Sequence, residues 1–168
     1  MKTPTKIFLQ RNRSIANNDL PALLYRGVLS PHVPRKERSF QKGFEKNGWV
    51  GVWTNVIFDY VHFHSNAHEV LGIAKGHVTV ELGGEGGRTF RLKPGDMLVL
   101  PAGVGHRRLA MDDDLAVVGA YPAGQSRYDM KREGRRIPKV ALPHSDPFYG
   151  HEGPLPTAWP ANRKQRKH

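Results

Sequence analysis

The sequence contains no cysteine, which excludes disulfide bonds, thiolate nucleophiles and cysteine-ligated zinc or iron–sulfur sites. It also has no apolar run near the ~18 residues that a membrane-spanning helix needs. The opening residues, MKTPTKIFLQRNRS, lack the apolar core of a secretory signal peptide. We therefore expect a cytoplasmic protein without a membrane partner.

Acidic residues are scarce, and the imbalance is unevenly distributed along the chain. The chain has 26 Lys and Arg against 15 Asp and Glu, for a formal net charge of +11. Residues 49–126 are close to neutral, whereas residues 1–48 and 127–168 are strongly basic, and the last stretch runs Arg163-Lys164-Gln165-Arg166-Lys167. Such flanks either contact nucleic acid or form a solvated surface. No helix-turn-helix, zinc-finger or RNP pattern accompanies the charge, which favours the solvated surface.

Glycine and proline are abundant, with 18 and 13 residues, so we expect many turns and few long helices. The best helical segment is residues 35–47, in which Phe40 and Phe44 share one face and Asn47-Gly48 provides a stop. We expect this helix to lie across the outer surface of a sheet. Residues 7–29 are predicted to be an edge segment, because Pro21 argues against a central strand.

Residues 49–121 have the composition of β-strands. Short segments rich in Val, Ile and aromatic residues, beginning with VGVWTNVIFDYVHFH, alternate with glycine and proline turns. This pattern predicts a sandwich or barrel. We expect residues 1–48 to be an extension packed on the barrel, residues 49–126 to be its core, and residues 127–168 to be a basic, proline-rich wrap and tail.

Five of the nine histidines lie between positions 62 and 106. His62 and His64 are two apart in a run of strand character, so their rings point to the same face. Glu69 and His106 would add a carboxylate and a third imidazole, and such a set suits a divalent transition metal. Two points stay open on spacing alone. Buried histidines are often hydrogen-bonded core residues, and His68 competes with Glu69, since only one of two adjacent strand residues faces inward.

The spacing of these residues resembles a known pair of motifs. His62-Phe63-His64, four residues, Glu69, six residues and Gly76 resemble the first motif of the cupin superfamily, with Val56 where the motif has glycine. Gly95, five residues, Pro101-Ala102-Gly103, two residues and His106 resemble the second, which here ends in Ala110 rather than asparagine. HSNAHEVLGIAKG, LPAGVGH and VVGAYPAGQ further resemble the poorly characterised YjlB-like cupins.

The resemblance implies an all-β fold: a single-domain cupin double-stranded β-helix, or jelly-roll barrel, with one short N-terminal helix and an extended C-terminal segment. The resemblance also implies that the metal ligands of cupins correspond to His62, His64, Glu69 and His106. It thereby favours Glu69 over His68 as the ligand. Iron, manganese, cobalt, nickel and zinc all suit this ligand set, and relative affinity does not identify the native metal. Cupins of this size commonly pair, so the resemblance also implies a homodimer.

Two further residues are candidates for a substrate pocket. Tyr60 shares a face with the first two histidines if their strand is regular, and Arg108 shares the face of His106. An arginine there would bind a carboxylate or a phosphate. The predicted function is that of a metal-dependent oxygenase or isomerase acting on a small organic molecule. The alternative is a non-catalytic module that binds or senses such a molecule, since the fold alone does not decide between them.

Overall fold

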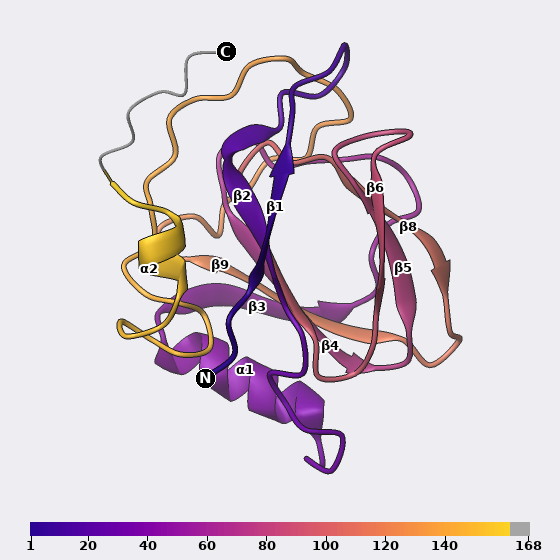
Figure 1. Cartoon of the computed structure of the whole chain (residues 1–168), viewed down its shortest axis with the longest axis vertical. Helices are drawn as coiled ribbons and strands as arrows, with labels where there is room; N and C mark the ends of the chain where they lie inside the picture. Colours follow the sequence, from indigo (N-terminus) through magenta and orange to yellow (C-terminus); the bar gives the residue numbers. More distant parts are fainter. Residues whose placement is uncertain (162–168) are drawn as a thin grey trace.

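Two antiparallel sheets enclose an apolar core in the computed structural model, which describes residues 1–161 (Figure 1). The larger sheet has the order β1-β2-β7-β4-β9-β3 and the smaller has the order β6-β5-β8. This architecture confirms the predicted all-β jelly-roll barrel. The strands are β1 (Thr5–Leu9), β2 (Asn18–Tyr25), β3 (Trp49–Asn55), β4 (Glu69–Lys75), β5 (Val78–Leu82), β6 (Arg88–Leu92), β7 (Met97–Leu100), β8 (His106–Met111) and β9 (Ala116–Pro122). The helices in the described part of the chain are α1 (Lys36–Lys46) and α2 (Leu155–Ala158).

The larger sheet is buried on both faces. Its inner face contributes Leu71 and Ile73 to the core shared with the smaller sheet. Its outer face contributes Val70 to a second apolar cluster, which also contains Phe40 and Phe44 of α1. The predicted helix and its position on the outside of a sheet are therefore confirmed. Because both faces are covered, every residue of β4 except the last is buried, a pattern typical of strands covered on both sides.

The prediction of an edge segment over residues 7–29 is wrong for its second half. β1 is the edge strand, but β2 lies between β1 and β7. Pro21 is tolerated because the pairing of β2 with β7 involves only residues 23–25. The β1–β2 register also shifts between Ile7 and Leu9, opposite the proline. A residue without an amide hydrogen thus sits where no ladder hydrogen bond to β7 is needed.

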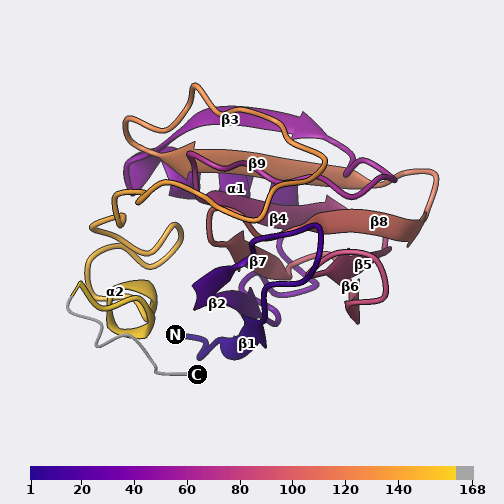
Figure 2. The same ribbon diagram turned by 90° about the horizontal axis from the view of Figure 1, so that it is seen from above.

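The segment between β9 and α2 contributes no strand to either sheet, and it crosses one end of the barrel (Figure 2). It is fixed by two isolated bridges, Phe63 to Lys131 and Ile15 to Gly134. Further on, the buried carboxylate of Asp146 accepts a hydrogen bond of 2.5 Å from the hydroxyl of Tyr25. The segment therefore packs onto the barrel as part of one structure.

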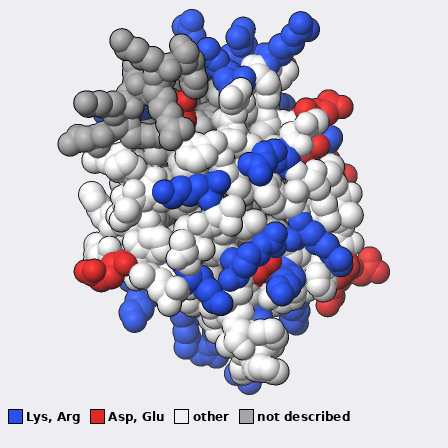
Figure 3. Space-filling model, in the orientation of Figure 1, with Lys and Arg blue, Asp and Glu red and all other residues white. Residues whose placement is uncertain are grey.

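Lys and Arg side chains are spread along the face shown in Figure 3, from one end of the molecule to the other, with few Asp or Glu. The basic run Arg163 to Lys167 lies outside the described residues. Within the described part of the chain, neither helix has the length and apolar character required to cross a membrane.

Candidate metal centre

The histidines at 62 and 64 lie between β3 and β4 of the larger sheet, in a linking segment that runs along the edge of the smaller sheet. The prediction of continuous strand character through residue 64 is wrong, because β3 ends at Asn55 and only isolated bridges follow. Beyond β3 the chain moves to the edge of β8, where Phe58 accepts a hydrogen bond of 2.9 Å from the amide of Arg108. His62 and His106 then exchange two backbone hydrogen bonds, of 3.2 and 3.0 Å. The crossing brings this segment directly beside the start of β8.

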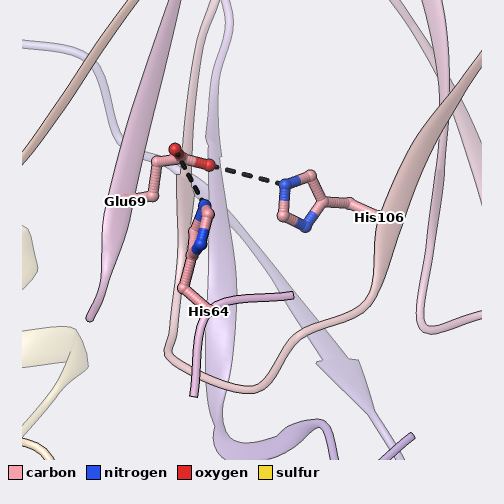
Figure 4. Close-up of side chains that lie close together, drawn as sticks. All are labelled: His64, Glu69 and His106. Atoms are coloured by element: carbon pink, nitrogen blue, oxygen red, sulfur yellow. Dashed lines mark ion pairs between the residues drawn. The ribbon is translucent and has the colours of Figure 1, made fainter. Parts of the chain in front are cut away.

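Three of the four expected ligands converge on one point (Figure 4). Glu69 begins β4, and its two carboxylate oxygens lie 3.3 Å from Nε2 of His64 and 3.4 Å from Nε2 of His106. One ligand atom from each of these residues lies within 4.8 Å of the other two, and all three side chains are buried. The site is therefore built from the linking segment, the larger sheet and the smaller sheet.

His62 lies beside this group rather than within it. Its ring centroid is 4.1 Å from that of His106 and 6.1 Å from that of His64. The side chain is buried and lines the same cavity as the other three. The assignment of His62 as a fourth ligand stays a prediction.

The backbone selects the nitrogen that each imidazole can offer to a metal. In all three histidines Nδ1 lies within hydrogen-bond distance of a backbone carbonyl oxygen, which can only accept. Nδ1 therefore carries the hydrogen, and in the neutral ring Nε2 keeps a free lone pair. The pairs are His62 with Tyr60 (2.9 Å), His64 with Asp129 (2.5 Å) and His106 with Val104 (3.0 Å).

The lone pairs at Nε2 of His64 and His106 consequently face a carboxylate, which is also an acceptor. Two acceptors at this distance repel each other unless a cation, either a proton or a metal ion, lies between them. Imidazole nitrogens held in one orientation by backbone carbonyls are typical of metal sites. The residues present therefore fit a divalent transition metal.

Burial and neighbouring charges set the protonation of the site. Burial alone would raise the pKa of Glu69, but its hydrogen bonds with His106 and His64 outweigh burial and hold the pKa well below its usual range. Burial would lower the pKa of His64, yet the hydrogen bond and charge of Glu69 raise it. Burial, with the neighbouring His106, lowers the pKa of His62 to about 3. The site thus holds one buried negative charge that a cation can compensate.

Residues 127–131 form a strap across the site, and sequence reasoning did not identify it. The carboxylate of Asp129 accepts hydrogen bonds from the backbone N–H of Ser65, at 2.7 Å, and from the Ser65 hydroxyl. The amide of Asp129 donates to the side-chain oxygen of Asn66 at 3.0 Å. These contacts place the Asp129 carbonyl on Nδ1 of His64. No sequence signal could have shown this, because 65 positions separate the two residues.

A cavity of about 220 Å³ opens beside the converging ligands. Its wall is largely aromatic and aliphatic, and two strap residues complete it. The lining residues are Trp53, Thr54, Asn55, Val56, Ile57, Phe58, His62, His64, Glu69, Leu71, His106, Tyr121, Tyr128 and Met130. The candidate metal ligands thus line a cavity that also has several aromatic and aliphatic side chains.

Trp53 reaches this cavity because β3 contains a bulge. The register with β9 shifts by one residue between Val50 and Trp53, and Gly51 adopts a φ of 65° there. The extra residue turns Trp53 inward, where its indole lies over Gly119 and donates a hydrogen bond of 2.9 Å to the Tyr121 hydroxyl. Gly51 is the local signal that could have indicated the change of face.

The other candidate residues lie around the site with different partners. Tyr60 is not among the lining residues: it stacks on Phe58 at 4.9 Å, and its hydroxyl lies 3.8 Å from the sulfur of Met130. Arg108 pairs with Val80, which places it on the core-facing side of β8, but it does not line the cavity. The roles proposed for Tyr60 and Arg108 in binding a substrate stay predictions.

His68 points away from the ligands, as the resemblance implied. Its Nδ1 accepts a hydrogen bond of 2.9 Å from the amide of Ala102, and its ring packs 5.0 Å from that of Trp159. Burial lowers its pKa to about 4, which keeps the ring neutral near pH 7. His68 is therefore a structural residue beneath the C-terminal segment.

Comparison with known proteins agrees with this architecture. A family model described as a cupin domain matches residues 58–118. The chain is 36% identical over 166 residues to the uncharacterized protein YjlB of Bacillus subtilis (strain 168), a match that covers 94% of this chain and 97% of that protein.

Solved structures resemble the chain more distantly. Acireductone dioxygenase from Bacillus anthracis, with a cadmium ion in its active center, is 17% identical with a TM-score of 0.44, over 62% of this chain and 79% of that one. An uncharacterized protein with a double-stranded beta-helix domain from Klebsiella pneumoniae is 12% identical with a TM-score of 0.39, over 78% and 80% of the two chains. These scores are too low to support any statement about function. The family model and the long match to YjlB, in contrast, show that the chain belongs to the cupin family, among the relatives of YjlB.

Proposed function

We propose that this cupin binds one divalent transition metal through His64, Glu69 and His106, with His62 as a fourth ligand, and that the adjoining cavity holds a small organic molecule. The observation that carries the proposal is the convergence of a carboxylate and two Nε2 lone pairs in a buried site. In each histidine Nδ1 donates a hydrogen bond to a backbone carbonyl oxygen. Rotation of the ring away from the metal would break this hydrogen bond.

The chemistry we propose is a metal-dependent reaction of the oxygenase or isomerase type. Among the described residues that line the cavity there is no serine, lysine or cysteine, and the hydroxyl of Thr54 accepts a hydrogen bond of 3.1 Å from Gln41 rather than donating to a base. A bound divalent metal supplies Lewis acidity and, where it is redox-active, electron transfer. The protein's own contribution is to pack aromatic and aliphatic side chains against the organic molecule, to orient it, and to hold Glu69 ionised beside it.

The test is elemental analysis of untagged protein after it has been loaded with each of iron, manganese, cobalt, nickel and zinc and then desalted. We expect close to one equivalent of metal in the unaltered protein and loss of that metal in His64→Ala and in His106→Ala. His77→Ala is the matched control, because this exposed histidine pairs with Asp112 outside the site. Circular dichroism verifies that each variant is folded.

Retention of a full equivalent in folded samples of both site variants would refute the ligand assignment. The proposal of a metal site would also be refuted if no metal binds to the unaltered protein under any loading condition. The homodimer implied by the cupin resemblance stays a prediction, which sedimentation equilibrium would check.

A further inference from the structure

The wall of the cavity combines aromatic side chains with an absence of lysine and arginine among its described residues. Four aromatic side chains, Trp53, Phe58, Tyr121 and Tyr128, contribute to it together with Met130. None of the described lining residues is a lysine or an arginine. A carboxylate or phosphate on the body of a ligand would therefore find no cationic partner along this wall, and would lose its hydration without replacement.

The aromatic groups pack against one another and form a continuous aromatic wall. Tyr121 and Tyr128 stack with centroids 4.3 Å apart and planes tilted by 24°. Tyr128 also meets the ring of His64 at 4.6 Å and 63°, so the wall runs without interruption from the cavity to a metal ligand. Aromatic rings favour offset stacks and edge contacts of these kinds with one another.

The mouth of the cavity is apolar and open to solvent. Phe58, Tyr128 and Met130 are 45%, 39% and 43% exposed, although all three line the cavity. Three of the six large hydrophobic side chains that are exposed in the described part of the chain thus gather at this one opening. Apolar surface concentrated at a cavity mouth is a sign of ligand binding.

The volume limits the size of the occupant. At about 220 Å³, the cavity is larger than the ~150 Å³ apolar cavity that accepts benzene. It is smaller than the ~300 Å³ at which the usual range of ligand pockets begins. This space suits one ring with a small substituent.

We infer that the site binds an uncharged, planar, single-ring compound that carries one oxygen donor directed toward the metal, and that the strap residues Tyr128 and Met130 determine this selectivity. The inference rests on the proposed function for the metal-directed oxygen, whereas the ring selectivity follows from the wall alone. Both strap residues lie beyond residues 58–118, the part matched by the cupin model. The selectivity would therefore come from a segment outside the matched cupin core.

The experiment compares phenol with cyclohexanol, which has the same ring size and a single hydroxyl but is not planar. Each alcohol competes with 4-fluorophenol for cobalt-loaded and metal-free protein, and fluorine NMR follows the displacement. Elemental analysis of the same samples gives the metal content. We expect phenol to bind about tenfold more tightly than cyclohexanol, given the added favourable contact between aromatic rings.

Two variants separate the role of the ring from that of bulk. Tyr128→Leu keeps an apolar side chain and should weaken phenol binding by about tenfold, whereas Tyr128→Phe keeps the ring and should preserve binding. Equal affinity for the two alcohols in metal-loaded protein, or unchanged phenol binding in Tyr128→Leu, would overturn the inference alone. A preference for phenol in protein that never holds metal would support ring selectivity and refute the metal-binding proposal.

Discussion

The strap across the candidate metal centre predicts that Asp129, which is outside the proposed ligand set, supports metal binding. Replacing Asp129 by alanine removes the carboxylate that joins the strap to Ser65. The backbone carbonyl that holds Nδ1 of His64 remains but loses the anchor to Ser65. The hydrogen bond from the Asp129 amide to Asn66 is kept. We therefore expect Asp129→Ala to lower both the stability of the protein and its affinity for metal.

The magnitude follows from the two hydrogen bonds that are lost. Ser65 is only 4% exposed, so its N–H and hydroxyl cannot both recover their partners from water. Hydrogen bonds to a charged acceptor contribute about 1.5–3 kcal/mol each. Asp129 is itself half-buried, which places the pair at the lower end, or about 3 kcal/mol in total. Loss of an outer hydrogen bond to a ligating histidine lowers metal affinity by about 10–100-fold.

Asp129→Asn serves as the partial-rescue variant. The asparagine oxygen can still accept from the Ser65 N–H, and the serine hydroxyl can rotate to accept from the new amide. We expect stability and metal affinity to fall in the order unaltered protein, Asp129→Asn, Asp129→Ala. Asp113→Ala is the control, because it removes an exposed aspartate from the turn between β8 and β9.

Urea unfolding of metal-free protein measures the first effect, and competition with a chromophoric chelator measures the second. The reasoning is refuted if Asp129→Ala lies within about 0.5 kcal/mol of the control in unfolding free energy and binds metal equally well. A loss of stability with unchanged metal affinity would refute the positioning role alone.

Three further outcomes are expected. Gly119→Ala should destabilise the protein by about 1–3 kcal/mol, because the new Cβ would overlap the Trp53 indole; an unchanged unfolding midpoint and tryptophan emission would contradict this. Tyr25→Phe should cost about 1.5–3 kcal/mol in the unfolding free energy, since it removes the hydrogen bond to the buried carboxylate of Asp146; Tyr60→Phe is the control for loss of a tyrosine hydroxyl. In the metal-free protein the pKa of His64 is raised above 6.5 by the nearby site carboxylate, which outweighs burial. Its contribution to stability is therefore present below pH 6.5 and lost as pH rises through the raised value, whereas metal affinity increases over the same interval because Nε2 becomes free. Thermal unfolding at several pH values, with zinc or with a chelator, should show these opposite slopes, and parallel slopes would refute the assignment.

Features that depend on short distances along the chain could be predicted from the amino-acid sequence. The absence of cysteine excluded thiolate ligands from any metal centre. The four-residue spacing of Phe40 and Phe44 predicted the face of α1 that is buried. The resemblance to the cupin motifs gave His62, His64, Glu69 and His106 as candidate ligands. The structure brings the last three together and places His62 beside them.

Spacing could not decide between His68 and Glu69, and the structure shows the physical reason. β4 is covered by the barrel core on one face and by α1 on the other, so its residues are apolar or buried at nearly every position. The alternation that distinguishes an inward from an outward residue is therefore missing. The family resemblance, not the periodicity, assigned Glu69 to the site.

Only the tertiary structure decided which distant segments complete the site. Asp129 and Tyr128 reach His64 across a chain separation that no local pattern records, because the closing of the barrel brings the C-terminal segment to its mouth. The bulge at Gly51 turns Trp53 inward, and one extra residue reverses the face of every residue that follows it in a strand. The candidate ligands could thus be predicted from the resemblance to the cupin motifs, whereas the walls around them depend on how the sheets and the strap pack together.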